Sequence, residues 1–125
     1  MTARLLLTAG ALLAALGVAL GAFGAHALRA RLSERMLAVW ETAVQYQLVH
    51  ALGLMAVGLL MLQLGQGGLL RWSGGLMLAG VVLFSGSLYL MCLGGPRWLG
   101  PVTPLGGVAF IAAWLLLALV VWRAV

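Results

Sequence analysis

The chain of 125 residues contains no lysine, aspartate or asparagine, and it has only one cysteine and two acidic residues. The single cysteine, Cys92, excludes an intrachain disulfide and a cysteine-rich metal site. Because Glu41 is the only acid near an apolar segment, the paired carboxylates of acid–base enzymes are also excluded. Gly65, Gly67 and Gly68 lack the lysine that a phosphate-binding loop needs, so we interpret them as a turn.

Most residues of the chain are apolar. The chain is 65% hydrophobic and 7% charged, and a soluble core could not bury that much apolar surface in so short a chain. A transmembrane helix needs about 20 predominantly apolar residues. Four segments are long enough: Leu5–Leu28, Val44–Leu64, Leu69–Leu93 and Val102–Trp122. The sequence therefore predicts an integral membrane protein.

We expect an all-α membrane protein whose fold is an antiparallel bundle of four transmembrane helices with short loops. Residues 1–125 form one domain, with spans at about 4–28, 40–64, 69–93 and 102–123. The start of the first span resembles a signal peptide, but its apolar run continues to Leu28, so we interpret it as a retained span.

An amphipathic helical extension is expected over residues 33–39, with Ser33 as its N-cap. A helix from Ser33 to Leu64 would be about 47 Å long, whereas the hydrocarbon core is about 30 Å thick. Its first two turns should therefore lie in the membrane interface, or a kink should separate them. Pro104 suits the first turn of the last span. We expect four tryptophans to anchor the interface: Trp40, Trp72, Trp98 and Trp122.

The formal net charge of +5 comes from arginines near the ends of the spans, where they can meet anionic headgroups. We therefore expect no nucleic-acid binding. Counting positive charges does not orient the chain, because three arginines fall on one side and four on the other. The first side carries Arg4, Arg71 and Arg123, and the second carries Arg29, Arg31, Arg35 and Arg97.

Small residues form a stripe on one face of the first span: Gly10, Ala14, Gly17, Gly21 and Gly24. Spacings of three and four place them on a single helical face, where small residues allow close approach of a second helix. We expect a packing seam within the chain, and the alternative is a groove open to lipid or to a neighbouring subunit. Gly86, Gly106 and Gly107 are expected to pack helices in the same way.

Polar side chains within the spans gather in one half of the expected bundle, the half toward the first and third loops. The opposite half is almost purely aliphatic. Each such group is unfavourable in hydrocarbon unless it finds a partner. We predict that eight of them bind a ligand: His26, Tyr46, Gln47, His50, Ser85, Ser87, Tyr89 and Thr103. The alternative is a network of hydrogen bonds that only holds the helices together.

Other chemistries fit the sequence poorly. His26 and His50 would lie about 10–20 Å apart along the membrane normal, which is too far to share one metal ion. Ser85 or Ser87 beside His50 could suggest a hydrolase, but no further hydrolase motif accompanies them. We therefore expect neither an enzyme nor a cofactor.

Four motifs occur in an order that resembles a known family. They are Gly21–His26, Tyr46-Gln47 with His50, Leu83–Tyr89, and Thr103-Pro104 with Gly106-Gly107. In these motifs the chain is similar to the YgdD-like inner-membrane proteins, a family of unknown function that includes the transmembrane protein 256 group. The resemblance covers nearly the whole chain. It implies four transmembrane helices in the bacterial cytoplasmic membrane with both termini in the cytoplasm, and it implies no established activity.

Two functional hypotheses follow. In the first, a polar pocket in one half of the bundle binds a small molecule or lipid headgroup, or aids its transport, with His26 and Arg29 at its mouth. In the second, the protein is a non-catalytic accessory subunit of a larger membrane complex. The expected partners are membrane lipids, together with further copies of the chain or a larger complex.

Overall fold

The computed structural model describes residues 1–125 and is all-helical, which confirms the predicted fold class. Its elements are α1 (Ala3–Phe23), η1 (Gly24–Leu28), α2 (Glu34–Leu64), α3 (Gly68–Gly80), η2 (Val81–Ser85), α4 (Gly86–Cys92) and α5 (Leu99–Ala124). The two η segments are π-helical turns. By length and composition, four helical stretches can cross a membrane: Ala3–Leu28, Glu34–Leu64, Gly68–Cys92 and Leu99–Ala124.

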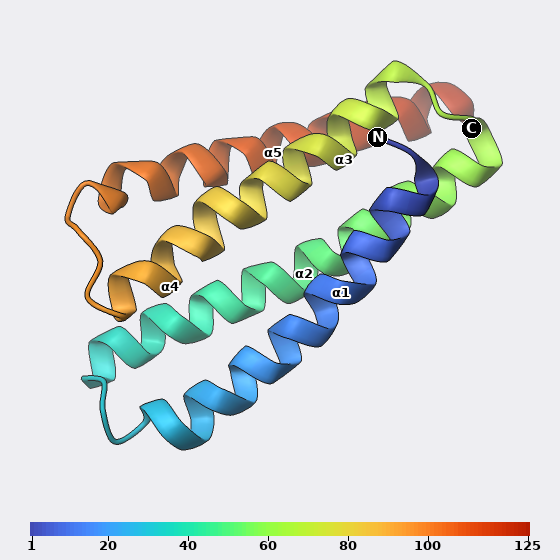
Figure 1. Ribbon diagram of the computed structural model, residues 1–125. Helices are drawn as coiled ribbons and strands as arrows, with labels where there is room; N and C mark the ends of the chain where they lie inside the picture. Colours follow the sequence, from blue (N-terminus) through green and yellow to red (C-terminus); the bar gives the residue numbers. More distant parts are fainter.

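The spans pack in chain order, as Figure 1 shows. The first span packs along α2, α2 packs against the third span, and the third span packs against α5. The first and last helices lie at opposite edges of this arrangement (Figure 1). Both termini lie at one end together with the α2–α3 link, and the other two loops lie at the opposite end (Figure 1). We call the latter the loop end.

The second helix is continuous over 31 residues, so no kink separates its amphipathic start from the span. Ser33 is its N-cap as predicted, because the Met36 N–H donates to the Ser33 hydroxyl. At 1.5 Å per residue the helix is about 46 Å long, roughly 16 Å more than the hydrocarbon core. Its ends therefore reach beyond the hydrocarbon.

Each of the two π-helical turns lies inside a span that the hydrophobic pattern predicted as plain α-helix. In the third span the Gly86 N–H donates to the Val81 carbonyl five residues back, which is the π-helical pattern. A π turn inserts one residue and rotates the side chains that follow it around the helix axis. In η2 this places Ser85 against α2 rather than toward its own helix.

Two sequence-based placements are wrong. Pro104 was expected in the first turn of the last span, but α5 begins at Leu99, so Pro101 occupies the first turn and Pro104 lies inside the helix. A proline in the first turn loses no helical hydrogen bond, because the first four N–H groups have no helical acceptor. Trp40 was expected as an interfacial anchor, but it is buried between α1 and α2, where its indole N–H donates to the Leu20 carbonyl.

The apolar core divides into two clusters. The larger lies toward the termini and joins four helices: Ala3, Leu6, Leu54, Val57, Met61, Leu70, Met77 and Ala113. The smaller lies toward the loop end: Leu28, Trp40, Val44 and Cys92. Apart from Ser73, the buried polar side chains of the spans lie in the loop-end half: Gln47, His50, Ser85 and Ser87.

Candidate functional site

The glycine stripe of α1 packs against α2 and brings the two helices close together. A Cβ atom at Gly10 would lie 2.7 Å from the Ala51 carbonyl oxygen, and one at Gly24 would lie 2.6 Å from the Trp40 ring. Gly17 and Gly21 approach Leu48 and Val44 in the same way. The backbones can approach this closely only because the side chains are missing. The stripe is therefore a seam within the chain.

The His50 side chain extends from α2 and is buried against α5, and both of its ring nitrogens form hydrogen bonds. The Trp114 indole N–H donates to Nε2 over 2.9 Å, and Nδ1 lies 2.7 Å from the Tyr46 carbonyl oxygen. An indole can only donate, so Nε2 must carry the lone pair and Nδ1 the proton. The Phe110 ring stacks on the imidazole with 3.5 Å between ring centroids. His50 therefore has no free nitrogen for a ligand.

Gln47 connects three spans. Its amide N–H donates to the Leu13 carbonyl of α1 over 2.9 Å, and its amide oxygen accepts from the Tyr89 hydroxyl of α4 over 2.6 Å. The side chain is 2% exposed. Both ends of the amide are thus used inside the protein, and they link α1 and α4 through one side chain of α2.

The serines form shorter links. The Ser85 hydroxyl donates to the Ala43 carbonyl of α2 over 2.7 Å. The Ser87 hydroxyl donates to the Phe84 carbonyl of its own helix and also forms a hydrogen bond with the Thr103 hydroxyl of α5. The structure therefore brings seven of the eight predicted residues into one region of the bundle, from three spans.

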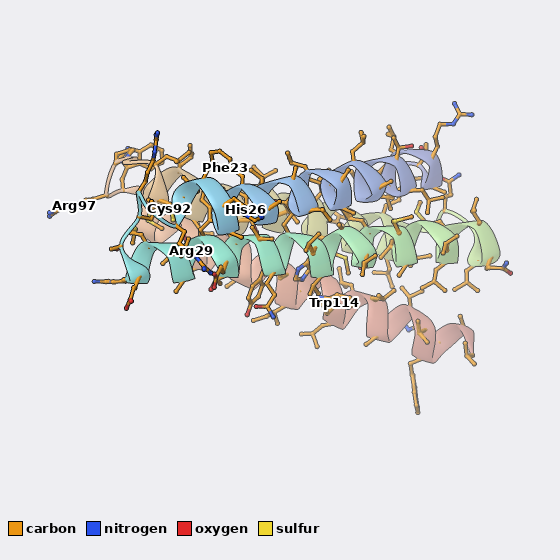
Figure 2. All side chains as sticks on the ribbon, turned by 90° about the horizontal axis from the view of Figure 1, so that it is seen from below. Phe23, His26, Arg29, Cys92, Arg97 and Trp114 are labelled. Carbon is orange, nitrogen blue, oxygen red and sulfur yellow. The ribbon has the colours of Figure 1, made fainter.

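His26 is the residue that does not join them. It is exposed on η1 near the loop end, as Figure 2 shows together with Arg29 and Arg97. Inside the bundle, no buried side-chain nitrogen or oxygen lacks a hydrogen-bond partner. That the eight residues bind a ligand stays a prediction. A ligand of the buried members would first have to displace an existing hydrogen bond.

Three polar side chains of α2 instead face outward: Glu41, Gln45 and Tyr46. We call them the polar strip. None of the three side chains forms a hydrogen bond within the chain, although the Tyr46 carbonyl accepts from His50. A hollow of about 260 Å³ lies on one side of the strip, between α1 and α2, and one of about 340 Å³ lies on the other, beside Val49 and His50. Gln45 lines both hollows.

Not every glycine expected to pack does so. Gly106 lies directly against the backbone of Phe84, so it brings α5 onto η2. By contrast, a Cβ at Gly107 would meet no atom within 4 Å, and one at Gly86 only the Val81 carbonyl of its own helix at 4.0 Å. Neither position is approached by a neighbouring helix. Gly86 instead lines an open groove of about 520 Å³ beside Trp98.

Two functional partners were missed from the sequence. Trp114 was not singled out, yet it is the hydrogen-bond donor that holds His50. Ser73 lies in the aliphatic half, where its hydroxyl donates to the Ala113 carbonyl over 2.8 Å. A tryptophan in the middle of a span is a usable signal, since its N–H requires an acceptor in hydrocarbon. Residue spacing alone does not identify that acceptor, because it lies on another helix.

No group of three or more His, Cys, Asp or Glu side chains is placed to hold a metal ion. Cys92 is buried, and its thiol donates to the Met36 carbonyl. The arrangement contains no nucleophile beside a base, because His50 contacts no hydroxyl group through its ring nitrogens.

Comparison with known proteins places these residues in a wider group. A family model described as a protein of unknown function (DUF423) matches residues 20–107, a range that contains all eight predicted ligand-binding residues. The UPF0382 membrane protein YwdK of Bacillus subtilis is 50% identical over 108 residues, covering 86% of this chain and 88% of the relative. The UPF0382 membrane protein SH2409 of Staphylococcus haemolyticus is 46% identical over 115 residues, covering 91% and 92%. No solved structure matches the chain.

Proposed function

The chain belongs to the DUF423 family, and for this small integral membrane protein we propose a non-catalytic role, the binding of an amphiphilic membrane molecule at the polar strip of α2. The observation that carries the proposal is the contrast between the two sets of polar groups. Every buried polar side chain is paired inside the protein, whereas Glu41, Gln45 and Tyr46 face outward without a partner.

The depth of the strip supports a ligand from the membrane. Glu41 follows the start of α2 by seven residues and Gln45 by eleven. If the excess length of α2 is divided equally between its ends, Glu41 lies about 2 Å inside the hydrocarbon boundary and Gln45 about 8 Å inside. Polar groups at this depth normally face the bundle interior or a partner. An outward strip therefore favours binding to a molecule with both polar and apolar parts.

In this proposal the buried residues hold the strip in place. His50 fixes the backbone of Tyr46 through the hydrogen bond to its carbonyl, and Gln47 lies between the two helices that flank α2. Hydrogen bonds between membrane helices contribute about 0.6 kcal/mol on average. Several such bonds in one region give α2 a defined rotation, and that rotation decides which side chains point outward.

The second candidate is the accessory subunit, in which another membrane protein covers the strip. A specific observation favours it as well. The first span packs mainly on α2, and its outer face presents small exposed side chains, including Ala11, Ala15 and Ala22. Small residues on an outer face suit contact with another helix. The two candidates differ in what accompanies the purified protein.

We also propose the cytoplasmic membrane as the location, with both termini in the cytoplasm, so that the loop end and the polar strip lie toward the outside. The support is the resemblance of the four ordered motifs to the YgdD-like group. The relatives from Bacillus and Staphylococcus are named membrane proteins, in agreement with this location.

Native mass spectrometry of protein extracted gently from its own membrane tests the proposal. We expect a small mass that binds in fixed ratio and is lost in the double variant Gln45→Leu/Tyr46→Phe. The matched control is Gln63→Leu, which removes an exposed amide from the same helix near its other end. Copurification of a second protein in fixed ratio would favour the accessory subunit. The binding role would be contradicted if wild type carried no bound mass, or only a mass that the double variant retains.

A further inference from the structure

The hollow between α1 and α2 has small residues on one wall and polar residues on the other. Gly21, Gly24 and Ala25 form the α1 wall, and Glu41 and Gln45 stand on the α2 wall. Trp40 closes the floor, since Gly24 packs directly on its ring and its indole N–H is already bonded to Leu20. The volume of the hollow, about 260 Å³, is sufficient for a small lipid headgroup.

The polar wall is built for a hydrogen-bond donor. Glu41 is the only acid that lines the hollow, and no arginine is among the lining residues. Its two carboxylate oxygens and the amide oxygen of Gln45 are acceptors. A primary ammonium carries three N–H donors and a positive charge, so it can satisfy all three acceptors. A trimethylammonium group has the charge but no N–H donor.

The surroundings complement the rest of a phospholipid. Arg29 follows Ala25 by one helical turn and lies at the loop end, beyond the hollow and toward the membrane surface. A guanidinium there can bind a phosphate. On the hydrocarbon side, the hollow continues into Leu48, and the exposed Leu52 follows one turn along α2. From the loop end toward the hydrocarbon the order is therefore cation, acceptors and apolar surface, so the bound headgroup folds back and its ammonium lies deeper than its phosphate.

We propose that this hollow binds a phospholipid whose headgroup ends in a primary ammonium, as in phosphatidylethanolamine. The ammonium is held by Glu41 and Gln45, and the phosphate by Arg29. This inference rests on the proposed binding function and names its ligand. It also predicts selectivity, because ethanolamine and choline headgroups have the same net charge and differ only in N–H donors.

The experiment compares phosphatidylethanolamine with phosphatidylcholine of identical acyl chains, added in equal amounts to delipidated full-length protein and counted by native mass spectrometry. We expect wild type to retain the ethanolamine lipid about tenfold better, which corresponds to one charge-assisted hydrogen bond. Glu41→Leu and Ala25→Leu should each abolish the preference, the first by removing the two carboxylate acceptors and the second by filling the hollow.

Matched controls are Glu34→Leu, which removes the other carboxylate, in the first turn of α2, and Ala22→Leu, at an exposed alanine that does not line the hollow. Both should keep the preference, and thermal unfolding checks that all variants are folded. Equal retention of the two lipids by wild type would overturn the inference, as would a preference that survives Glu41→Leu. The two lipids could be retained equally while protein from native membranes still carries a bound mass that is lost when the polar strip is mutated. In that case the proposed binding function stands and only the identity of its ligand changes.

Discussion

At the scale of single residues, the indole of Trp114 and the imidazole of His50 define the contact between α2 and α5. The donor-only indole sets the tautomer of His50, and the other nitrogen of the ring then donates to the Tyr46 carbonyl. Phe110 stacks on the same ring and Phe84 contacts Tyr46, so four aromatic rings enclose the imidazole region. One histidine therefore connects the interior of the bundle to the outward strip.

We predict that His50→Ala lowers the free energy of unfolding by about 1–3 kcal/mol, because it leaves the indole N–H of Trp114 without an acceptor. Unfolding in mixed detergent micelles measures this. The pair His50→Phe/Trp114→Phe should lose less than the sum of its single variants, since both polar groups are then removed together. Additive losses would show that the two side chains are not coupled.

At the scale of elements, neighbouring glycines on α5 have opposite environments. Gly106 lies against the Phe84 backbone, where η2 and α5 meet, whereas Gly107 faces open space. The π-helical turn of η2 contributes to the same contact, because it directs Ser85 to α2 while Phe84 meets α5. Close packing of the third span on α5 thus depends on glycines at the contact and on the residue that the π-helical turn inserts.

We predict that Gly106→Ala separates α5 from η2 and destabilises the protein by about 1–3 kcal/mol, the usual range for overpacking. Gly107→Ala serves as the control and should stabilise it by up to about 1 kcal/mol through helix propensity. Thermal unfolding of the two variants in the same detergent compares them. Equal destabilisation would indicate that α5 packs in a different rotation.

At the scale of the whole molecule, the spans pack in chain order and separate two chemically different ends. The loop end carries the polar network, the strip and four of the seven arginines. The terminal end carries the larger aliphatic core. Since the number of spans is even, both termini lie on one side of the membrane, and the polar half faces the other side (Figure 1).

We predict that this other side is the outside. In a Cys92→Ser background, Ala30→Cys at the loop end should react with a membrane-impermeant thiol reagent in intact cells. Ala124→Cys near the C-terminus should react only after the cells are permeabilised. Both alanines are exposed, so accessibility in the protein itself is matched. The reversed pattern would place the polar half in the cytoplasm.

The composition and the four apolar segments by themselves determined an all-helical membrane fold, because few charges and long apolar runs are stable only in lipid. The helical cap at Ser33 was equally local, since a cap forms within one turn of its own chain. Only the tertiary structure decided that Trp114 meets His50 and that Trp40 is buried. It likewise decided that Gly106 packs while Gly107 does not, and that Gln45 and Glu41 face outward. These facts depend on the rotation of each helix about its axis and on the two π-helical turns. Contacts between segments that are distant in the sequence determine both.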